Sequence, residues 1–370
     1  MKDVFRIISI IFFVVIINAD NVWIPRTIQE YPKEPVWPYY LADPGAFESN
    51  GVYYMVGTGS GFSQGNATFA AMSSHDMVTW TYVGEVLRYV ERPNQTFQYW
   101  APEIIERDNV FYLYYSVGNE NDTFLLRVAT SNSPLGPYDD EEGIDLTDIN
   151  TVSAIDPSPF RDPATGLWYL FYTRNTFNTN NGFRIGTGIA VDRLIDMTTL
   201  AGNETIILRP QFDWQLYDPN LPGANNSTVS WYVLEAPFVW QKEPGVYVCF
   251  YSGSNWRNST YGVDYAISYS TPMGPYFQDN TSEPRISRTL TDNAIGPGHN
   301  SIVLGRDQRT TYMVYHAWDR NQTTRSPFVS QLNWKRELVP SSSSNQDFLH
   351  VTLAFLVYFI IILLIFQHAL

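Results

Sequence analysis

The pair Asp156-Pro157 and the aromatic block Trp168-Tyr169-Leu170-Phe171-Tyr172 that follows it decide the fold of this chain. An acidic residue beside a proline precedes a similar block at three other places, and a fifth copy has Gly298-His299-Asn300 in place of the acid and proline. The other copies are Asp43-Pro44 with Val52–Val56, Pro102-Glu103 with Phe111–Tyr115, Glu235-Ala236-Pro237 with Tyr247–Tyr251, and the fifth with Tyr312–His316. The chain is therefore built from five imperfect repeats.

Each repeat has the pattern of several short β-strands. Runs of β-branched and aromatic residues alternate with clusters of Gly, Pro, Asn, Asp and Ser, which is typical of strands and turns. No part of the sequence shows sustained helical periodicity. The prolines and glycine that mark the repeats are 55 to 80 residues apart, a period typical of propeller blades. We therefore expect an all-β, five-bladed β-propeller that forms one catalytic domain over residues 20–340.

A propeller would bring distant acidic residues together. The innermost strand of each blade lines the central channel, so residues at the starts of these strands surround one mouth of it. We expect Asp43, Asp156 and Glu235 to face one space there. Two carboxyls across a pocket suit glycosidic cleavage, because one donates a proton to the leaving oxygen while the other stays ionised. A third carboxylate raises the pKa of the acid by repulsion. The alternative is that these acids cap surface turns.

The ordered motifs resemble glycoside hydrolase family 43 over residues 38 to 336. The matching segments are Ala42-Asp43-Pro44, Trp100-Ala101-Pro102-Glu103, Ala154-Ile155-Asp156-Pro157-Ser158, Glu235-Ala236-Pro237-Phe238, Gly298-His299-Asn300-Ser301 and Tyr315-His316-Ala317-Trp318-Asp319. Members of this family are five-bladed propellers that hydrolyse arabinose- or xylose-containing glycans with inversion. The resemblance implies that Asp43 is the general base, Asp156 the pKa modulator and Glu235 the general acid. Inversion predicts Asp43 and Glu235 carboxyls ~6.5–9.5 Å apart.

Four further residues are candidates for binding. Trp100 and Trp256 are candidates for stacking on a sugar, with core packing as the alternative for Trp100. Arg325 resembles a basic residue that the family places near the end of the propeller. His299 resembles an axial histidine of the arabinan-degrading branch that lies near a hydrated calcium ion. Calcium prefers several oxygen ligands, so a neutral His299 that hydrogen-bonds the carboxylates is the alternative. The chemistry itself requires no cofactor.

The expected function is inverting hydrolysis of α-L-arabinofuranosyl linkages in a pentose-containing glycan. A β-xylosidase is the nearest alternative, and a glycan-binding propeller without catalysis is an alternative of another class. The presence of all three acids argues against the second. Exo or endo action stays open. The net charge of −14 argues against nucleic acid or an anionic membrane surface as a partner. We expect a monomer.

Both ends of the chain have the composition of targeting segments. Residues 1–19 read as a secretory signal peptide, with the charged Lys2 and Arg6, the apolar run Ile7–Ile17 and the small residue Ala19. Residues 341–370 read as a glycolipid-anchor signal, with small polar residues before the apolar tail Phe348–Phe366. A single-pass membrane helix is the alternative. No Lys or Arg follows the tail to support it.

The remaining signals agree with an extracellular, membrane-anchored protein. Nine Asn-x-Ser/Thr sequences predict glycosylated surface loops. Cys249 is the single cysteine, so no intramolecular disulfide is possible, and its apolar neighbours predict a buried thiol.

Overall fold

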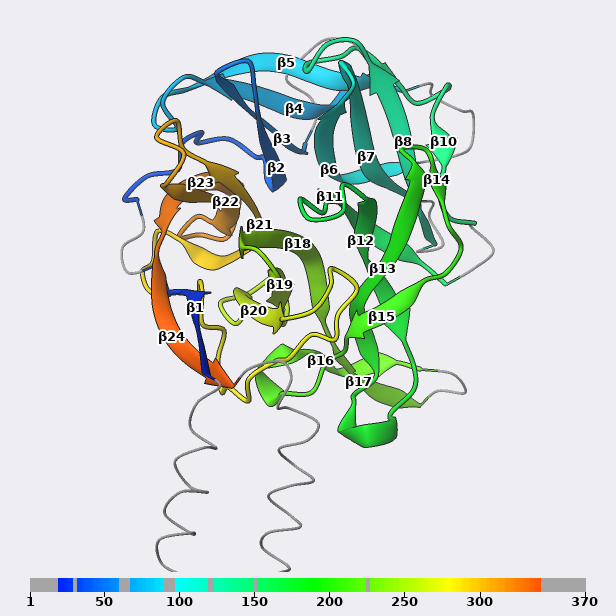
Figure 1. Cartoon of the computed structure of the whole chain (residues 1–370), viewed down its shortest axis with the longest axis vertical. Helices are drawn as coiled ribbons and strands as arrows, with labels where there is room; N and C mark the ends of the chain where they lie inside the picture. The colour runs from blue at the N-terminus through cyan, green and yellow to red at the C-terminus, as the bar shows by residue number, and fades with distance from the viewer. Residues whose placement is uncertain are drawn as a thin grey trace, which may run out of the picture. The chain divides into compact units, whose positions relative to one another are not determined.

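The computed structural model describes residues 19–28, 32–59, 67–89, 97–118, 123–148, 152–223 and 227–340. Within the compact unit Pro25–Asn333, five β-sheets lie around a common centre (Figure 1). The described residues include no α-helix and two single-turn 3-10 helices, η1 (Asn180–Gly182) and η2 (Asp213–Gln215). The expected all-β, five-bladed propeller is confirmed.

The blades follow one another along the chain. The first contains β2 (Ala42–Ser49), β3 (Val52–Thr58), β4 (Ala67–Ser74) and β5 (Trp80–Arg88), with β9 (Tyr138–Asp139) at its edge. The second contains β6 (Gln98–Arg107), β7 (Val110–Gly118), β8 (Phe124–Ser131) and β10 (Ile144–Asp145). The third contains β11 (Ala154–Arg161), β12 (Trp168–Thr176), β13 (Gly186–Asp196), β14 (Thr199–Leu200), β15 (Thr205–Leu208), β16 (Leu216–Pro222) and β17 (Thr228–Tyr232).

The last two blades have three strands each. They are β18 (Leu234–Glu243), β19 (Val246–Gly253) and β20 (Gly262–Ser268), then β21 (Ile295–Leu304), β22 (Thr311–Trp318) and β23 (Arg325–Leu332). The innermost strands β2, β6, β11, β18 and β21 contact one another in chain order, and β21 contacts β2 to close the ring (Figure 1).

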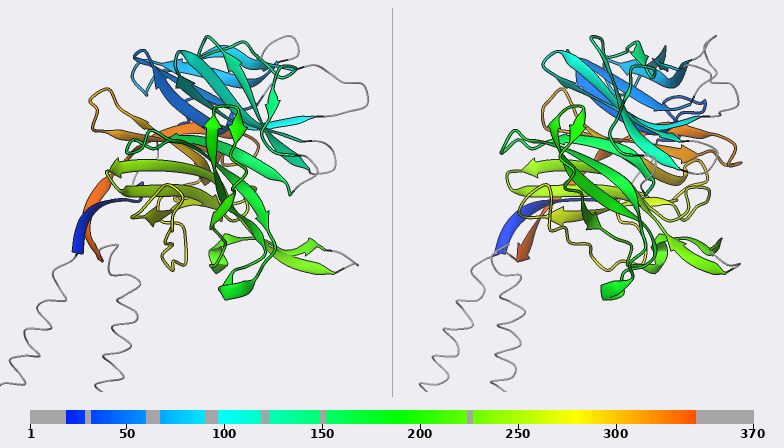
Figure 2. Two further views of the ribbon diagram at one scale, coloured as in Figure 1. Left: turned by 45° about the vertical axis from the view of Figure 1, so that its right-hand side comes forward. Right: turned by 90° about the vertical axis from the view of Figure 1, so that its right-hand side faces the viewer.

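The core lies between neighbouring sheets. Aromatic side chains fill these layers, as where Phe69 of the first blade meets Tyr115 of the second edge-on, with 5.8 Å between ring centroids. Phe160 and Tyr247 meet in the same way between the third and fourth blades. Figure 2 shows the packed sheets from two further sides, with the hairpin β16–β17 projecting from the third blade. Cys249 lies buried in the core, as expected.

Every innermost strand carries the same bulge near its start. At each bulge one residue adopts a left-handed conformation, with φ between 49° and 57°, and the pairing register shifts there. The five residues are Asp43, Ala101, Asp156, Ala236 and His299. This conformation costs about 1–3 kcal/mol in a residue other than glycine, so the surrounding structure must stabilise it.

That stabilisation comes from a hydrogen bond to the preceding blade. The backbone N–H of each left-handed residue donates to a side chain near the end of that blade's second strand. The pairs are Ala101 to Thr58 (2.8 Å), Asp156 to Ser116 (2.9 Å), Ala236 to Thr173 (3.2 Å), His299 to Ser252 (2.8 Å) and Asp43 to His316 Nδ1 (3.0 Å). These are called the inter-blade hydrogen bonds below. Four acceptors are hydroxyls, and a histidine closes the ring.

A second compact unit contains β1 (Ala19–Pro25) up to Ile24 and β24 (Trp334–Pro340), which pair as a two-stranded sheet. Arg336 there donates to the carbonyl of Asn21. The expected single domain over residues 20–340 stays a prediction. The signal segment before Ala19 and the anchor segment 341–370 lie outside the described residues. In the part of the chain that the structure describes, no helix has the length and apolarity to cross a membrane.

Removal of one inter-blade hydrogen bond should destabilise the ring. Ser116→Ala leaves the buried N–H of Asp156 without its acceptor, so we expect the free energy of unfolding to fall by about 1–3 kcal/mol. Ser270→Ala, at an exposed position, should change it by less than about 0.5 kcal/mol. Denaturant unfolding measures both. Equal stability of the two variants would contradict a structural role for these hydrogen bonds.

Candidate active site

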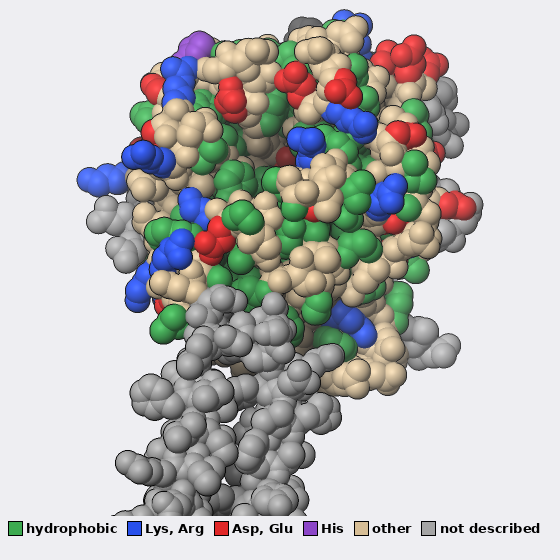
Figure 3. All heavy atoms as spheres, viewed as in Figure 1, with side chains coloured by type: hydrophobic (Ala, Val, Ile, Leu, Met, Phe, Trp, Pro, Cys, Tyr) green, Lys and Arg blue, Asp and Glu red, His purple; other side chains and the backbone are tan. Residues whose placement is uncertain are grey.

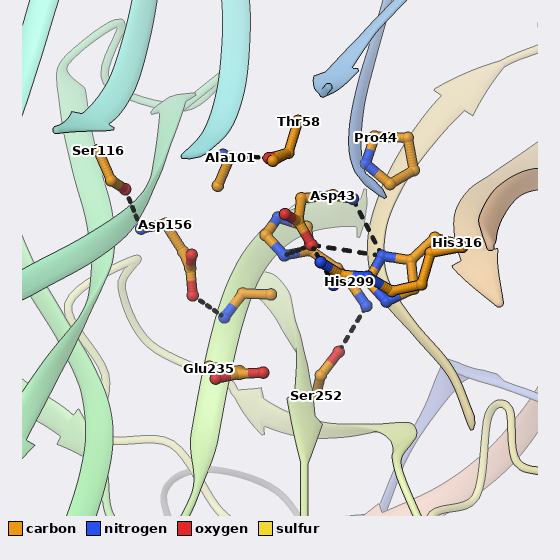
Figure 4. Close-up of polar contacts among 12 residues, drawn as sticks. Asp43, Pro44, Thr58, Ala101, Ser116, Asp156, Glu235, Ser252, His299 and His316 are labelled. Carbon is orange, nitrogen blue, oxygen red and sulfur yellow. Dashed lines mark hydrogen bonds and ion pairs between the residues drawn. The ribbon is translucent and has the colours of Figure 1, made fainter. Parts of the chain in front are cut away.

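The three predicted acids lie around one space at the centre of the ring. Figure 4 shows the carboxyls of Asp43, Asp156 and Glu235 about this space, with His299 and His316 beside Asp43. The space-filling view shows a hollow near the centre of the face drawn, with basic and acidic side chains beside it (Figure 3). Propeller closure thus brings together residues that are remote in sequence.

Asp43 is surrounded by cationic and imidazole groups. Its Oδ1 lies 3.3 Å from Nη1 of Arg325 and 3.4 Å from Nδ1 of both His299 and His316. Burial alone would raise the pKa of Asp43, but Arg325 and then the two imidazoles hold it well below its usual range. The hydroxyl of Thr58 lowers this pKa further. Asp43 is therefore an ionised carboxylate at neutral pH.

Aromatic rings hold Arg325 in place. Its guanidinium carbon lies 4.4 Å from the ring centre of Trp256 and 5.6 Å from that of Trp318, and Nη2 donates to the hydroxyl of Tyr40 at 2.7 Å. The two tryptophans stack on each other, and Trp318 Nε1 donates to the carbonyl of Trp256 at 2.7 Å. These cation–π contacts and the hydrogen bond fix the cation beside Asp43.

His316 is neutral at neutral pH. Burial, followed by the charge of Arg325, lowers its pKa well below its usual range. Nδ1 accepts the backbone N–H of Asp43, so the single proton of the imidazole is on Nε2. His316 therefore closes the ring of blades and orients the backbone of Asp43.

Asp156 is tied to the backbone beside Glu235. Its Oδ2 accepts from the hydroxyl of Thr173 at 2.9 Å and from the N–H of Ala236 at 3.0 Å. Burial is the largest effect on its pKa and raises it, and the charge of Asp43 acts in the same direction. The carboxylate is thereby held close to the acid that it is predicted to modulate.

Glu235 has the opposite electrostatic setting to Asp43. Burial, followed by the charge of Asp156, raises the pKa of Glu235 to about 8. Its Oε1 accepts a hydrogen bond from the hydroxyl of Tyr261 at 2.6 Å. Glu235 is therefore mostly protonated at neutral pH, while Asp43 is ionised.

The three acids occupy nearly equivalent positions of the repeat, but not identical ones. Asp43 and Asp156 are themselves left-handed residues at the bulge, whereas Glu235 precedes the left-handed Ala236. Glu103 follows Ala101 by two positions, and burial raises its pKa well above the usual range. Proline therefore marks the bulge without fixing which neighbour carries the acid.

Trp100 is placed differently from Trp256. It stacks on Phe124 of its own blade, with 4.0 Å between ring centroids, whereas Trp256 covers Arg325. The roles predicted for both tryptophans in sugar binding stay predictions. Sequence reasoning missed Tyr261 and Tyr40, which touch Glu235 and Arg325, because both lie in loops outside the repeated motifs.

The side chains around His299 give limited support to the calcium hypothesis. In the described residues no three His, Cys, Asp or Glu side chains gather as a metal site. His299 offers one nitrogen, and its Nδ1 lies beside Asp43. Calcium takes about 6–8 oxygen ligands. These residues therefore do not fit a calcium site made of protein ligands, and a bound ion would depend on water.

Comparison with known proteins agrees with this geometry. The model of glycosyl hydrolases family 43 matches residues 32–340. The chain belongs to glycosyl hydrolases family 43. It is 29% identical over 311 residues to a β-D-galactofuranosidase of Aspergillus niger, covering 80% of this chain and 79% of the relative. It is 27% identical over 314 residues to an extracellular endo-α-(1→5)-L-arabinanase of Bacillus subtilis, covering 80% and 85%.

A solved structure supports the family and the fold. The crystal structure of a thermostable family-43 glycoside hydrolase matches with a TM-score of 0.62 and 29% identity, over 80% of this chain and 89% of that one. The sequence-based assignment to this glycosidase family is confirmed. The relatives act on different sugars, so they leave the specificity of this family member open.

The raised pKa of Glu235 should cost stability at neutral pH. Between its ordinary value of 4.5 and about 8, the folded state binds more protons here than the unfolded state, so this group's contribution to stability falls as pH rises. Glutamine does not titrate, so Glu235→Gln removes this pH-dependent loss of stability. We expect its melting temperature to exceed that of the wild type by a margin that grows by a few degrees from pH 5 to pH 8.

Thermal unfolding of both proteins across this range measures the margin, with Glu48→Gln at an exposed position as the control. A margin that stays constant or shrinks as pH rises would contradict the raised pKa.

Proposed function

We propose that this family 43 protein hydrolyses α-L-arabinofuranosyl linkages in arabinose-containing glycans with inversion. The observation that carries the proposal is the split between two carboxyls in one cluster, with Asp43 held ionised by Arg325 and Glu235 kept protonated by burial and Asp156. General acid–base cleavage of a glycoside needs one carboxyl in each state.

In this mechanism Asp43 accepts a proton from a water molecule as the water oxygen bonds to the anomeric carbon. Glu235 gives its proton to the glycosidic oxygen, whose bond to that carbon breaks on the opposite face. The products are the free sugar with inverted configuration and the alcohol that left. Proton exchange with solvent then returns Asp43 to the carboxylate and Glu235 to the acid.

A second candidate substrate is a β-D-galactofuranoside. It is supported by the Aspergillus niger relative, a β-D-galactofuranosidase that aligns over 80% of this chain. Its five-membered ring has the same configuration as α-L-arabinofuranose, and its side chain is one carbon longer. A β-xylosidase, and a glycan-binding propeller without catalysis, are the remaining alternatives. Comparison of p-nitrophenyl arabinofuranoside, galactofuranoside and xyloside as substrates separates these proposals. No hydrolysis of any of them or of arabinan would favour the binding protein.

Substitution of the two carboxyls should have different effects. Asp43→Asn should lower kcat at least about 10²-fold on every substrate, because the water loses its base. Glu235→Gln should lower kcat about 10²- to 10⁴-fold on an arabino-oligosaccharide and less on the p-nitrophenyl glycoside, whose leaving group needs little protonation. Glu48→Gln is the control. Wild-type activity in either carboxyl variant would contradict the assignment.

The stereochemistry of the product tests inversion separately. We expect the first sugar released from an α-arabinofuranoside to be the β-anomer, observed by proton NMR before mutarotation. Release of the α-anomer would instead require a retaining mechanism, in which Asp43 is a nucleophile.

We further propose that catalysis requires no metal, because acid and base are both supplied by side chains. Dialysis against a chelator should leave kcat unchanged. A loss of activity that calcium restores would contradict this, whereas a calcium-dependent rise in melting temperature without a change in kcat would show an ion that binds without a role in catalysis.

Secretion, glycosylation, a lipid anchor and a monomeric state complete the proposal. The extracellular relative favours secretion. The sequences that predict glycosylation include Asn258 and Asn321, which lie on exposed loops. Phospholipase treatment of cells that express the chain, followed by mass spectrometry and light scattering of the released protein, tests all four. Retention on the membrane would contradict the lipid anchor.

A further inference from the structure

Beyond the three acids, one buried tyrosine determines how the proposed acid can hold its proton. We propose that Tyr261 is a positioning residue that confines the catalytic proton of Glu235 to Oε2. The proposal rests on the assignment of Glu235 as the general acid. Nothing in the repeated motifs points to Tyr261, which lies in the loop before β20.

The hydrogen bond between Tyr261 and Glu235 joins two groups at the centre of the site. The hydroxyl of Tyr261 donates to Oε1 of Glu235 at 2.6 Å. As a donor, the phenol occupies the hydrogen-bonding position that a proton on Oε1 would need.

Tyr261 keeps its proton in this chain. It is 1% exposed, and burial, followed by the charge of Glu235, raises its pKa well above the usual range. A proton on Oε1 of Glu235 would face the proton of the phenol at hydrogen-bonding distance. The acid therefore places its own proton on Oε2, the oxygen left for the substrate.

Packing holds the ring of Tyr261 in this orientation. It lies parallel to the imidazole of His316, with 6.0 Å between ring centroids and 7° between planes. Gly298 lies against the same ring, so close that a Cβ at position 298 would come within 2.0 Å of Cε1. The ring of Tyr261 leaves no room for a side chain at position 298, which explains the glycine there. The same ring therefore contacts the histidine that orients the base and the carboxyl that serves as acid.

The test compares Tyr261→Phe with the wild type, Glu235→Gln and Tyr251→Phe. Phenylalanine retains the ring under Gly298 and removes only the hydroxyl. Tyr251→Phe is the matched control, because it removes a buried hydroxyl that donates to Gln278 elsewhere in the same blade. Each protein is assayed for kcat on an arabino-oligosaccharide and on the p-nitrophenyl glycoside, across pH.

Two changes are expected in Tyr261→Phe and absent in Tyr251→Phe. The hydrogen bond from Tyr261 lowers the pKa of Glu235, so its removal should move the alkaline limb of the pH profile to higher pH. The loss of kcat should be about tenfold larger on the oligosaccharide than on the p-nitrophenyl glycoside, because only the former depends strongly on a correctly placed proton.

The outcomes distinguish the role of Tyr261 from the proposed function. An inactive Glu235→Gln together with a Tyr261→Phe that behaves like Tyr251→Phe overturns the role of Tyr261 and leaves the proposed function intact. A fully active Glu235→Gln overturns both. A shifted alkaline limb with a leaving-group-dependent loss in Tyr261→Phe alone supports the proposal.

Discussion

The hydrogen bond from a left-handed backbone N–H to the neighbouring blade is the constraint on which this structure depends. It occurs once at every junction between blades and stabilises a conformation that costs free energy without it. Because the bulge redirects the chain at the mouth of the channel, the side chains of Asp43, Asp156 and His299 come from the bulged residues themselves. Fold closure and site assembly thus share three of the five bulged positions, and Glu235 directly precedes a fourth.

The departures from this symmetry provide the groups of the proposed chemistry. Four junctions use a hydroxyl, and the fifth uses His316, whose ring also packs against Tyr261. The two sides of the site are then tuned in opposite directions, with Arg325 lowering the pKa of Asp43 and burial with Asp156 raising that of Glu235. A lowered pKa keeps Asp43 ionised but weakens it as a base. Arg325 therefore fixes the charge and orientation of Asp43 and lowers its affinity for a proton.

Because repeated strands and prolines leave a periodic pattern, the sequence was sufficient to predict the blade number and the convergence of Asp43, Asp156 and Glu235. Arg325 was a binding candidate only through the family resemblance, and its place beside Asp43 was not predicted. The sequence was insufficient to identify Tyr261 and Tyr40, since loop residues outside the repeated motifs have no fixed place in the periodic pattern. The sequence also does not show that Glu235 lies one residue before the bulge, because the left-handed conformation is a backbone property that Ala236-Pro237 does not reveal by itself. Trp256 was predicted to stack on a sugar, which stays a prediction, and its contact with Arg325 could not be predicted because it depends on packing between blades.

At neutral pH the free enzyme holds Asp43 ionised and Glu235 protonated. Isotope-edited infrared spectroscopy of the wild type, with Asp43→Asn and Glu235→Gln to assign the bands, measures this directly. We expect Glu235→Gln to remove a protonated-carboxyl band at pH 7, and Asp43→Asn to remove a carboxylate band that persists below pH 4. A Glu235 that is already ionised at pH 7, or an Asp43 that is protonated there, would contradict it.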